Sequence, residues 1–403
     1  MDYAALAQKY GTPLYIYDFD HMARQYQILK EAFGARKSLL AYAIKANSNL
    51  SVIRHFARLG AGADCVSLGE IKRAQLAGVP KYKIIFSGMG KRDDEIAGAL
   101  KADILFVNVE SEAELGRVEA IAEQMGVVAR VSVRVNPDID PKTHPYISTG
   151  LKENKFGVSI EAARGMYLRI KNSAHLEATG IHFHIGSQLT ELDPILEATD
   201  RVADLLRSLK ALELEGLRFF DVGGGLGITY KEESPIDAKA YAEGIYQRIK
   251  DLDMTILCEP GRFLTGAAGH FLTRVLYEKR SGDKRFVVVD GAMNDLLRPT
   301  LYKAYHRIEI VGKESQGPLA DVVGPVCESG DYFAKEVPLP ETAHDDLMVI
   351  HSAGAYGFVM SSNYNSRRRA AEVAIEAGSD RLIRPRESYE QLWQSELEWM
   401  QTP

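Results

Sequence analysis

Lys45, in the segment YAIKANSN, is the side chain from which a chemical role follows most directly. It is a lone lysine at the end of an apolar stretch that is predicted to be a strand. An amine in such surroundings must be paired with an acid, deprotonated or used covalently, because burying an unpaired ammonium is costly. One interpretation is a Schiff base between this amine and a carbonyl cofactor. The alternative is a lysine whose stem is buried while its ammonium reaches water.

The segment HFHIGSQ places His182 and His184 two residues apart, so that on a strand both would lie on one face. Two histidines suggest a metal, but no acidic residue or third histidine has matching spacing, and we therefore predict no metal site. His184 instead suits an imidazole that lies flat on an aromatic cofactor, with Gly186 and Ser187 as small groups able to meet an anion. For His182 we favour a role in the core.

Two further motifs, DVGGGLG and CEPGR, carry groups that suit a phosphorylated ring cofactor. The four glycines of residues 221–227 let backbone amides approach a phosphate closely, although such turns also serve packing. The motif lacks the G-x-G-x-x-G spacing of a dinucleotide site. Glu259 could hold a pyridine nitrogen protonated and so make the ring an electron sink. The structural alternative is an ion pair between Glu259 and Arg262.

Cys327 is a further candidate for a reactive side chain, and it precedes Glu328 in the segment VGPVCESGD. The later segment HSAGAYGFVMSSNYN carries Tyr356 between small residues. A single cysteine is usually a buried structural thiol, so only its neighbours could make Cys327 catalytic.

The elements that must position these residues form a repeated pattern between residues 38 and 261. Short apolar, β-branched runs alternate with amphipathic stretches, as expected of strand-helix units around a parallel sheet. Two of the helical stretches have clear signals, with Ser51 and Gly60 at the ends of one and Ser111 and Gly126 at the ends of the other. The eight strand-like runs are residues 38–46, 62–67, 83–88, 104–109, 129–136, 180–186, 219–225 and 255–261.

Eight such units predict an α/β fold with a (β/α)₈, TIM-like barrel. The polar and glycine residues at the ends of the runs would then meet at the barrel mouth, where active sites of this fold lie. They are Lys45, Asp64, Arg134, His184, the glycines 223–225 and Glu259. The long polar segment Pro137–Gly157 is expected to form a loop over that mouth.

The predicted domains are a barrel over residues 21–266 and a β domain formed by residues 1–20 plus 267–403. After about residue 265 the sequence alternates without long helical periods, which favours an all-β, sandwich- or barrel-like domain. The strand-like segments there are residues 271–279, 284–292, 306–311 and 347–353 and a hairpin at 371–384. The early segment TPLYIYDFD is also extended and is expected to pair with this domain.

Composition excludes several classes of function. The 403 residues carry a net charge of −6 with interspersed signs, so there is no basic surface for nucleic acid. No apolar run is long enough to span a bilayer, and the first residues do not resemble a secretory signal. Three cysteines, Cys65, Cys258 and Cys327, are too few for a disulfide framework, and a cytoplasmic location is expected.

Seven motifs in order resemble the alanine-racemase-type (fold-type III) decarboxylases that use pyridoxal 5'-phosphate, and most closely the diaminopimelate decarboxylase family. The resemblance covers almost the whole chain and is carried by YAIKANSN, HFHIGSQ, DVGGGLG, CEPGR, LRPTLY, GPVCESGD and GAYG with NYN. It implies decarboxylation of meso-2,6-diaminopimelate to L-lysine and CO₂, the last step of lysine biosynthesis.

The resemblance also implies roles for individual residues. Lys45 would hold the cofactor, with Asp64 near its amine, His184 stacked on the ring and Glu259 on the pyridine nitrogen. The phosphate and the rest of the cofactor would be held by Ser187, Gly224, Gly225, Pro260, Gly261, Arg262 and Tyr356. Cys327 would protonate Cα, and Cys327 and Glu328 would come from the other subunit of a homodimer. The distal end of the substrate would contact Arg262, Arg298, Tyr302, Glu328 and Tyr356.

Three other functions remain open. A decarboxylase of ornithine, arginine or carboxynorspermidine would use the same scaffold, but those substrates lack a distal carboxylate for Arg298. A racemase needs proton donors on both faces of Cα and would not favour carboxylate loss. A non-catalytic pyridoxal-phosphate-binding protein would not need a β domain with substrate-type motifs.

Overall fold

A computed structural model describes residues 1–140, 155–209 and 212–400, and the chain divides into two compact units. The barrel unit contains Ala23–Ile228 and Ser234–Leu264. The sheet unit contains Met1–Met22, Thr229–Glu233 and Thr265–Pro403. The sequence did not indicate that the short segment 229–233 groups with the sheet unit.

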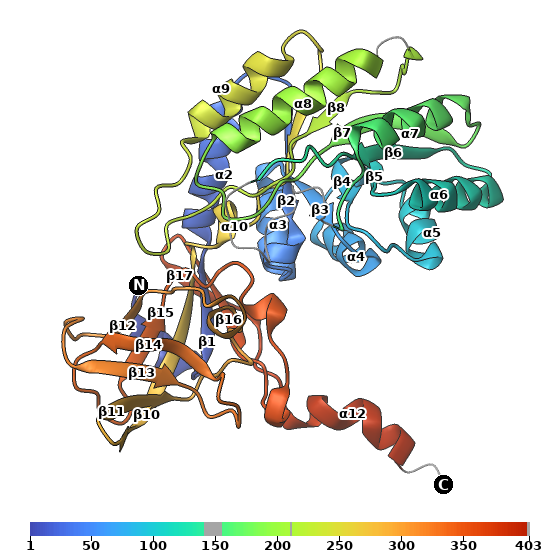
Figure 1. Ribbon diagram of the computed structural model, residues 1–403. Helices are drawn as coiled ribbons and strands as arrows, with labels where there is room; N and C mark the ends of the chain where they lie inside the picture. Colours follow the sequence, from blue (N-terminus) through green and yellow to red (C-terminus); the bar gives the residue numbers. More distant parts are fainter. Residues whose placement is uncertain (141–154, 210–211, 401–403) are drawn as a thin grey trace. The chain divides into compact units, whose positions relative to one another are not determined.

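The barrel unit is a closed barrel in which β2 to β9 pair in sequence order and β9 pairs with β2, all in parallel (Figure 1). The predicted (β/α)₈ barrel is therefore confirmed. Its strands are β2 (Ser38–Ala43), β3 (Gly62–Cys65), β4 (Ile84–Phe86), β5 (Phe106–Val109), β6 (Ala129–Arg134), β7 (Leu176–His182), β8 (Phe219–Asp221) and β9 (Thr255–Cys258).

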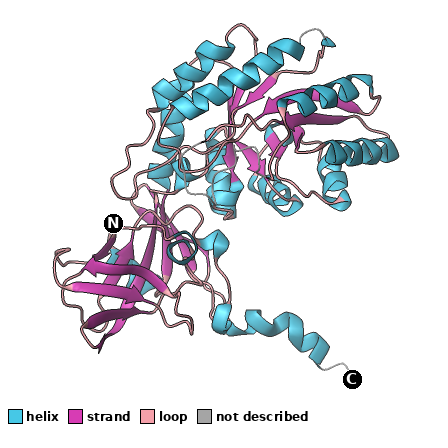
Figure 2. Cartoon of the chain, viewed as in Figure 1, coloured by secondary structure: helices cyan, strands magenta, loops and turns pink. Residues whose placement is uncertain are grey.

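Helices accompany these strands on the outside of the barrel, as the cyan ribbons around magenta strands show (Figure 2). They are α2 (Phe19–Phe33), α3 (Leu50–Leu59), α4 (Leu68–Ala77), α5 (Asp93–Lys101), α6 (Glu112–Met125), α7 (Ile160–Asn172), α8 (Asp193–Leu209), α9 (Ala238–Ile249) and α10 (Arg262–Thr265). Inside the barrel, buried apolar side chains from different strands pack together, among them Ala41, Ile85, Phe106 and Leu257.

The helix signals explain where two of these helices begin and end. Ser111 accepts a hydrogen bond from the backbone of Glu114 and Gly126 adopts φ +66°, so both predicted ends of α6 are confirmed. Gly60 ends α3 as predicted, with φ +99°. The predicted start of α3 at Ser51 is wrong, because the side chain of Asn49 caps the helix and accepts from Ser51 N.

One strand differs from its predicted extent in a way that affects the site. β7 begins at Leu176, where it pairs with Ala129 of β6, and it ends at His182. His184 therefore lies in the loop after the strand, and the expectation that both histidines share one strand face is wrong.

The sheet unit is built around a nine-stranded sheet in which the main path runs β14-β13-β11-β10-β1-β16-β17, with β15 joined to β10 and β12. Its elements are α1 (Tyr3–Tyr10), β1 (Leu14–Asp18), β10 (Gly269–Ser281), β11 (Lys284–Val289), α11 (Arg298–Tyr302), β12 (Ile308–Ile310), β13 (Leu319–Val323), β14 (Tyr332–Pro338), β15 (Leu347–Ile350), β16 (Ala371–Glu376), β17 (Ser379–Arg384) and α12 (Tyr389–Met400).

The early extended segment pairs with this sheet, as predicted. β1 lies between β10, to which it is antiparallel, and β16, to which it is parallel with Leu14 opposite Ala371. The hairpin of β16 and β17 is also confirmed. The short helices α11 and α12 were not predicted in this β domain.

Two other expectations concern the predicted loop over the barrel mouth and the absence of membrane-spanning segments. Most of the predicted loop Pro137–Gly157 falls in residues 141–154, which lie outside the described residues. Among the helices that the structure describes, none has both the length and the apolar character needed to cross a bilayer.

Candidate active site

Lys45 lies in a short 3₁₀ turn, Ile44–Ala46, directly after β2. Its Nζ donates a hydrogen bond of 2.5 Å to Oδ2 of Asp64 on β3. The Asp64 side chain is fully buried, whereas 34% of the Lys45 side chain is exposed. Burial and the charge of Glu259 raise the pKa of Asp64, and Lys45 opposes that shift. Lys45 is thus paired with a buried acid and still reachable from the barrel mouth.

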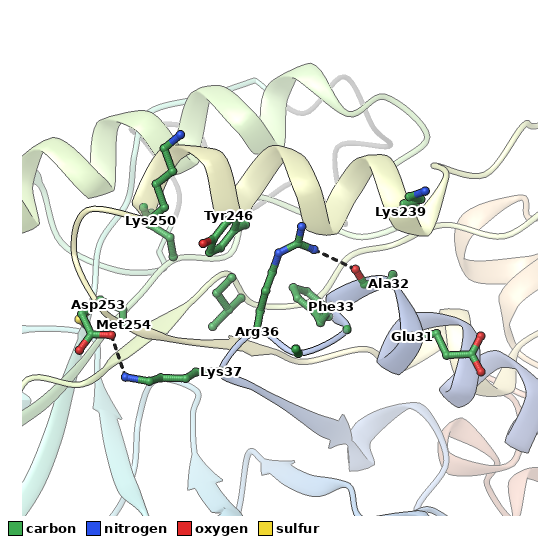
Figure 3. Close-up of a pocket in the computed structure, with 14 residues that line it drawn as sticks. Glu31, Ala32, Phe33, Arg36, Lys37, Lys239, Tyr246, Lys250, Asp253 and Met254 are labelled. Carbon is green, nitrogen blue, oxygen red and sulfur yellow. Dashed lines mark hydrogen bonds and ion pairs between the residues drawn. The ribbon is translucent and has the colours of Figure 1, made fainter.

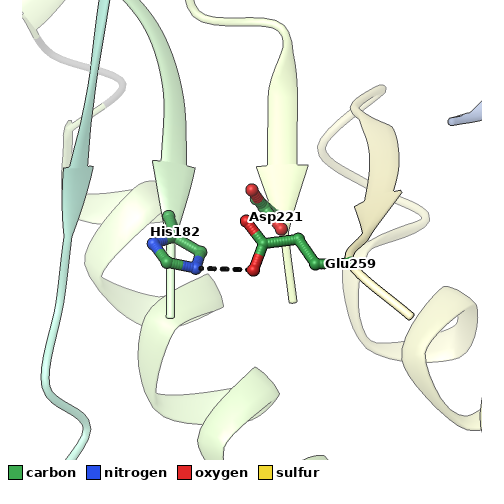
Figure 4. A group of neighbouring side chains, drawn as sticks. All are labelled: His182, Asp221 and Glu259. Carbon is green, nitrogen blue, oxygen red and sulfur yellow. Dashed lines mark ion pairs between the residues drawn. The ribbon is translucent and has the colours of Figure 1, made fainter. Parts of the chain in front are cut away.

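A second group of buried side chains comes from three neighbouring strands (Figure 4). Ligand-type atoms of His182, Asp221 and Glu259 all lie within 4.8 Å of one another, and His182 Nε2 is 3.6 Å from Glu259 Oε2. Burial alone would raise the pKa of Glu259, but His182 and Lys45 outweigh burial and lower it. Burial and the charge of Glu259 raise the pKa of Asp221 well above its usual value. Of the two carboxyl groups, Glu259 is therefore the one that favours the ionised form.

This group contradicts the expectation that no acidic residue accompanies the histidines in a metal-ligand arrangement. No acidic residue with suitable spacing could be found next to the histidines, yet Asp221 at the end of β8 and Glu259 after β9 both reach His182. The spacing rule fails because neighbouring barrel strands bring together residues about one strand-helix unit apart in sequence. The absence of a metal thus stays a prediction.

The glycine loop after β8 passes very close to two other backbone segments. A Cβ atom on Gly224 would lie 2.2 Å from the carbonyl oxygen of Glu259, and one on Gly225 would lie 2.3 Å from that of Gly186. Gly225 also has φ +107°, which L residues rarely adopt. Only glycine fits here, so the loop's amides are held against the end of β9 and the loop after β7.

His184 meets this loop through its ring. Its Nδ1 is 3.2 Å from the amide nitrogen of Gly224, which donates to it, so Nδ1 carries no hydrogen. Burial, followed by the positive charges of Arg134 and Lys45, lowers the pKa of His184 well below its usual value. His184 is therefore a neutral imidazole whose hydrogen is on Nε2.

The segment CEPGR packs against the turn that carries Lys45. Ala43 N donates to the carbonyl oxygen of Pro260, and a Cβ atom on Gly261 would lie 3.0 Å from that of Ala46. Arg262 Nη2 donates a 3.0 Å hydrogen bond to the hydroxyl of Ser187. The serine after β7 and the arginine after β9, both expected near a phosphate, therefore converge at one place.

A buried ion pair stands beside these groups at the end of β6. Arg134 Nη1 is 2.9 Å from Glu110 Oε1, and the two side chains are 7% and 2% exposed. Glu110 Oε2 also accepts from the amide of Gly157, and the Arg134 guanidinium lies 4.8 Å from the centre of the Phe156 ring. The pair fixes the cation whose charge contributes to the lowered pKa of His184.

The remaining predicted site residues lie in the sheet unit. Arg298 and Tyr302 are on α11, and the hydroxyl of Thr300 ties that helix to the carbonyl of Gly330. The exposed Cys327 and Glu328 lie in the turn between β13 and β14, and Cys327 N donates a 2.8 Å hydrogen bond to Asn365 Oδ1.

Tyr356, in the same unit, has φ +55°, an unusual backbone conformation for a tyrosine. Such conformations cluster at functional sites.

Sequence reasoning missed several polar neighbours of these residues. Asn108 Nδ2 donates to Ser87 Oγ inside the barrel, and Ser87 Oγ lies 3.4 Å from Glu259 Oε1. In the sheet unit, His306 and Tyr230 contact Arg298. Each of these residues sits in an ordinary strand or turn pattern, so no motif marked them.

A cavity of about 640 Å³ lies at the opposite, amino-terminal ends of β2 and β9 (Figure 3). Two of its cations are already engaged, since Lys37 pairs with Asp253 at 2.7 Å and Arg36 pairs with Glu243. Active sites of barrels lie at the carboxyl ends of the strands. We therefore place the candidate active site around Lys45 and not in this cavity.

Comparisons with known proteins identify the family to which the chain belongs. The profile of the family described as "Pyridoxal-dependent decarboxylase, pyridoxal binding domain" matches residues 19–266. The diaminopimelate decarboxylase of Campylobacter jejuni is 56% identical over 391 residues, covering 97% of each chain. That of Helicobacter pylori strain J99 is 53% identical over 403 residues, covering 99% of each.

Solved structures give the same result. The crystal structure of diaminopimelate decarboxylase from Helicobacter pylori complexed with L-lysine is 53% identical, with a TM-score of 0.96, and the match covers 99% of this chain and 100% of that one. A lysine/ornithine decarboxylase from Vibrio vulnificus shares the fold at 24% identity, with a TM-score of 0.82. Identity over nearly the full length thus separates the two kinds of relative, and the chain belongs to the diaminopimelate decarboxylase family of pyridoxal-dependent decarboxylases.

Proposed function

We propose that this protein uses pyridoxal 5'-phosphate to decarboxylate meso-2,6-diaminopimelate, giving L-lysine and CO₂ as the last step of lysine biosynthesis. The observation that carries the proposal is the amine of Lys45, 2.5 Å from the buried Asp64 at the barrel mouth. The relatives that match the whole chain, including one solved with L-lysine, support the substrate.

The residues at the mouth fit the chemistry of this cofactor. Lys45 supplies the amine that binds the aldehyde, and Oδ1 of the buried Asp64 has no hydrogen-bond partner among the described residues. Ser187, Gly225, Gly261 and Arg262 supply hydroxyl, amide and guanidinium donors for a phosphate. In this structure the Gly224 N–H donates its hydrogen bond to His184 Nδ1. A hydrogen bond from Gly224 to the phosphate therefore requires this bond to His184 to break.

Glu259 and His184 would act on the ring of the cofactor. An ionised Glu259 can accept a hydrogen bond from a protonated pyridine nitrogen, and the lowered pKa of Glu259 favours that state. A neutral His184 can lie against the ring without repelling that positive charge. Bound pyridoxal phosphate supplies the electron sink for the carbon that loses its carboxylate.

The sheet-unit residues would serve the substrate. Arg298 and Arg262 would bind the distal carboxylate together with Tyr302, and Glu328 would contact the distal amine. Tyr356 would close the site. Cys327 would hold the proton that Cα receives after CO₂ leaves.

We further propose a homodimer in which Cys327 and Glu328 complete the partner's site. Both residues are exposed in the single chain, and a second subunit would shield the proton donor from water. A free thiol at Cys327 also fits the reducing cytoplasm, the proposed location. Mixing inactive Lys45→Ala and Cys327→Ala subunits should restore part of the activity. Persistent inactivity of verified mixed dimers would contradict shared sites.

The test of the reaction is CO₂ release from labelled diaminopimelate, lysine, ornithine and arginine. We expect release from meso-diaminopimelate far above the other three and an absorbance band near the visible edge. Lys45→Ala should abolish both, while Arg298→Ala should impair turnover much more than cofactor binding. A colourless parent enzyme with full activity, or equal activity on ornithine, would contradict the proposal.

A further inference from the structure

Arg298 is a buried cation that contacts two aromatic rings of the sheet unit. It is 6% exposed, its Nη1 lies 2.9 Å from Nε2 of His306, and its guanidinium carbon lies 4.6 Å from the centre of the Tyr230 ring. The two rings contact each other edge to face, with centres 5.5 Å apart and planes at 81°. The guanidinium thus lies over one ring and is hydrogen-bonded to the other.

The hydrogen bonds of His306 fix its tautomer. Its Nδ1 lies 2.8 Å from the carbonyl oxygen of His351, which can only accept, so Nδ1 carries the hydrogen. In a neutral ring Nε2 then has a lone pair and accepts from Arg298. Backbone pairing holds the imidazole there, because His351 N donates to Arg307 O and Ile308 pairs with Ile350.

Tyr230 lies in a turn, residues 229–233, that is fixed by several hydrogen bonds. The carboxylate of Glu233 accepts hydrogen bonds from three successive amides, those of Tyr230, Lys231 and Glu232, at 2.9, 2.7 and 3.2 Å. The hydroxyl of Thr229 donates to the carbonyl oxygen of Glu233. This is the short segment that groups with the sheet unit although it lies between β8 and α9 in sequence.

We propose that His306 and Tyr230 are positioning residues that fix the plane and rotation of the Arg298 guanidinium and thereby set affinity for the substrate's distal carboxylate. Bidentate binding of a carboxylate requires both to be fixed, because the two N–H bonds must be parallel. Contact with the Tyr230 ring limits how the guanidinium can tilt, and an acceptor at Nη1 limits how it can rotate. The inference rests on the proposed function, in which Arg298 binds that carboxylate.

Two substitutions of His306 separate its two hydrogen bonds. His306→Asn keeps a donor near the Nδ1 position for His351 but loses the acceptor for Arg298. His306→Gln places an amide oxygen near the Nε2 position and keeps that acceptor. In steady-state CO₂ release from meso-diaminopimelate, we expect His306→Asn to raise KM roughly ten- to hundredfold with little change in kcat, and His306→Gln to raise it less. Inhibition by L-lysine, which retains one carboxylate, should weaken by the same factor.

Two further comparisons exclude a merely structural effect. Tyr230→Leu should raise KM more than Tyr230→Phe, which keeps the ring face. In an Arg298→Ala background, His306→Asn should have no further effect on KM, since its effect acts through Arg298. His344→Asn, at a histidine whose side chain is 72% exposed, is the matched control and should behave like the parent.

The outcomes distinguish the two proposals. No CO₂ from diaminopimelate in the parent enzyme would overturn the proposed function itself. An active parent in which His306→Asn and His306→Gln share the parent's KM, or in which His306→Asn still raises KM without Arg298, would overturn the positioning role alone. If the His306→Asn protein fails to fold, the comparison of Tyr230→Leu with Tyr230→Phe decides. Equal KM values for these two variants would refute the inference.

Discussion

Replacing Glu110 by glutamine should destabilise the barrel unit much more than its single ion pair suggests. The substitution keeps the shape of the side chain and an oxygen for the Gly157 amide, but it leaves the guanidinium of Arg134 only 7% exposed and without its carboxylate. Breaking a buried pair by removing one partner costs about 3–5 kcal/mol. For a domain of this size that corresponds to a fall in melting temperature of roughly 6–20 °C.

The assay is thermal unfolding of the purified protein without added cofactor, because bound ligand would mask the change. Glu197→Gln, which removes an exposed pair with Arg201 on α8, is the control and should cost only about 0.3–0.5 kcal/mol. The double variant Glu110→Gln/Arg134→Met removes both charges and should recover most of the loss. A single Glu110→Gln variant as stable as the Glu197→Gln control would refute the reasoning.

Three other predictions concern the cofactor site and the sheet unit. Glu259→Gln should leave the cofactor bound, as judged by absorbance, but reduce CO₂ release roughly 10²- to 10³-fold, and an unchanged rate would count against the role of its charge. Gly224→Ala should weaken cofactor affinity in a fluorescence titration, because its Cβ would meet a carbonyl oxygen at 2.2 Å, whereas Gly165→Ala, with open space around it, should not. Burial and the neighbouring His351 lower the pKa of His270 to about 4, so the unfolded chain binds the extra proton first and stability should fall as the pH drops from about 6.5 towards 4, by up to about 3 kcal/mol. His270→Asn should flatten that pH profile of the melting temperature, and an identical slope would contradict the assignment.

The barrel could be predicted from sequence because its strands are buried on both faces and therefore appear as continuous apolar runs. The start of β7 was missed because Glu177 and Thr179 interrupt its apolar pattern. In the sheet unit, β14 was missed because its exposed residues include Lys335 and Glu336, which obscure the alternation. The helix α12 has no buried residue, so no packing pattern marked it.

The candidate site shows a similar division. The residue types at strand ends were readable, because a lysine, a glycine loop and a carboxylate at the carboxyl ends of barrel strands have few structural reasons to be there. The residues that contact these side chains from other segments of the chain could not be predicted. Asp221 reaches Glu259, and His306 reaches Arg298, only through tertiary packing, and nothing in the local sequence of either indicates which residue it will meet.

The central place of β1 has a consequence for how the chain is made. One of its edges must wait for β16, since Leu14 pairs with Ala371, and the ribosome needs on the order of tens of seconds to synthesise the intervening residues. During that time an apolar strand near the amino terminus has an unsatisfied edge, although the whole barrel can already be translated. Assembly of the sheet must therefore wait until β16 has been translated, and truncated chains that lack β16 and β17 should be prone to aggregate through this segment.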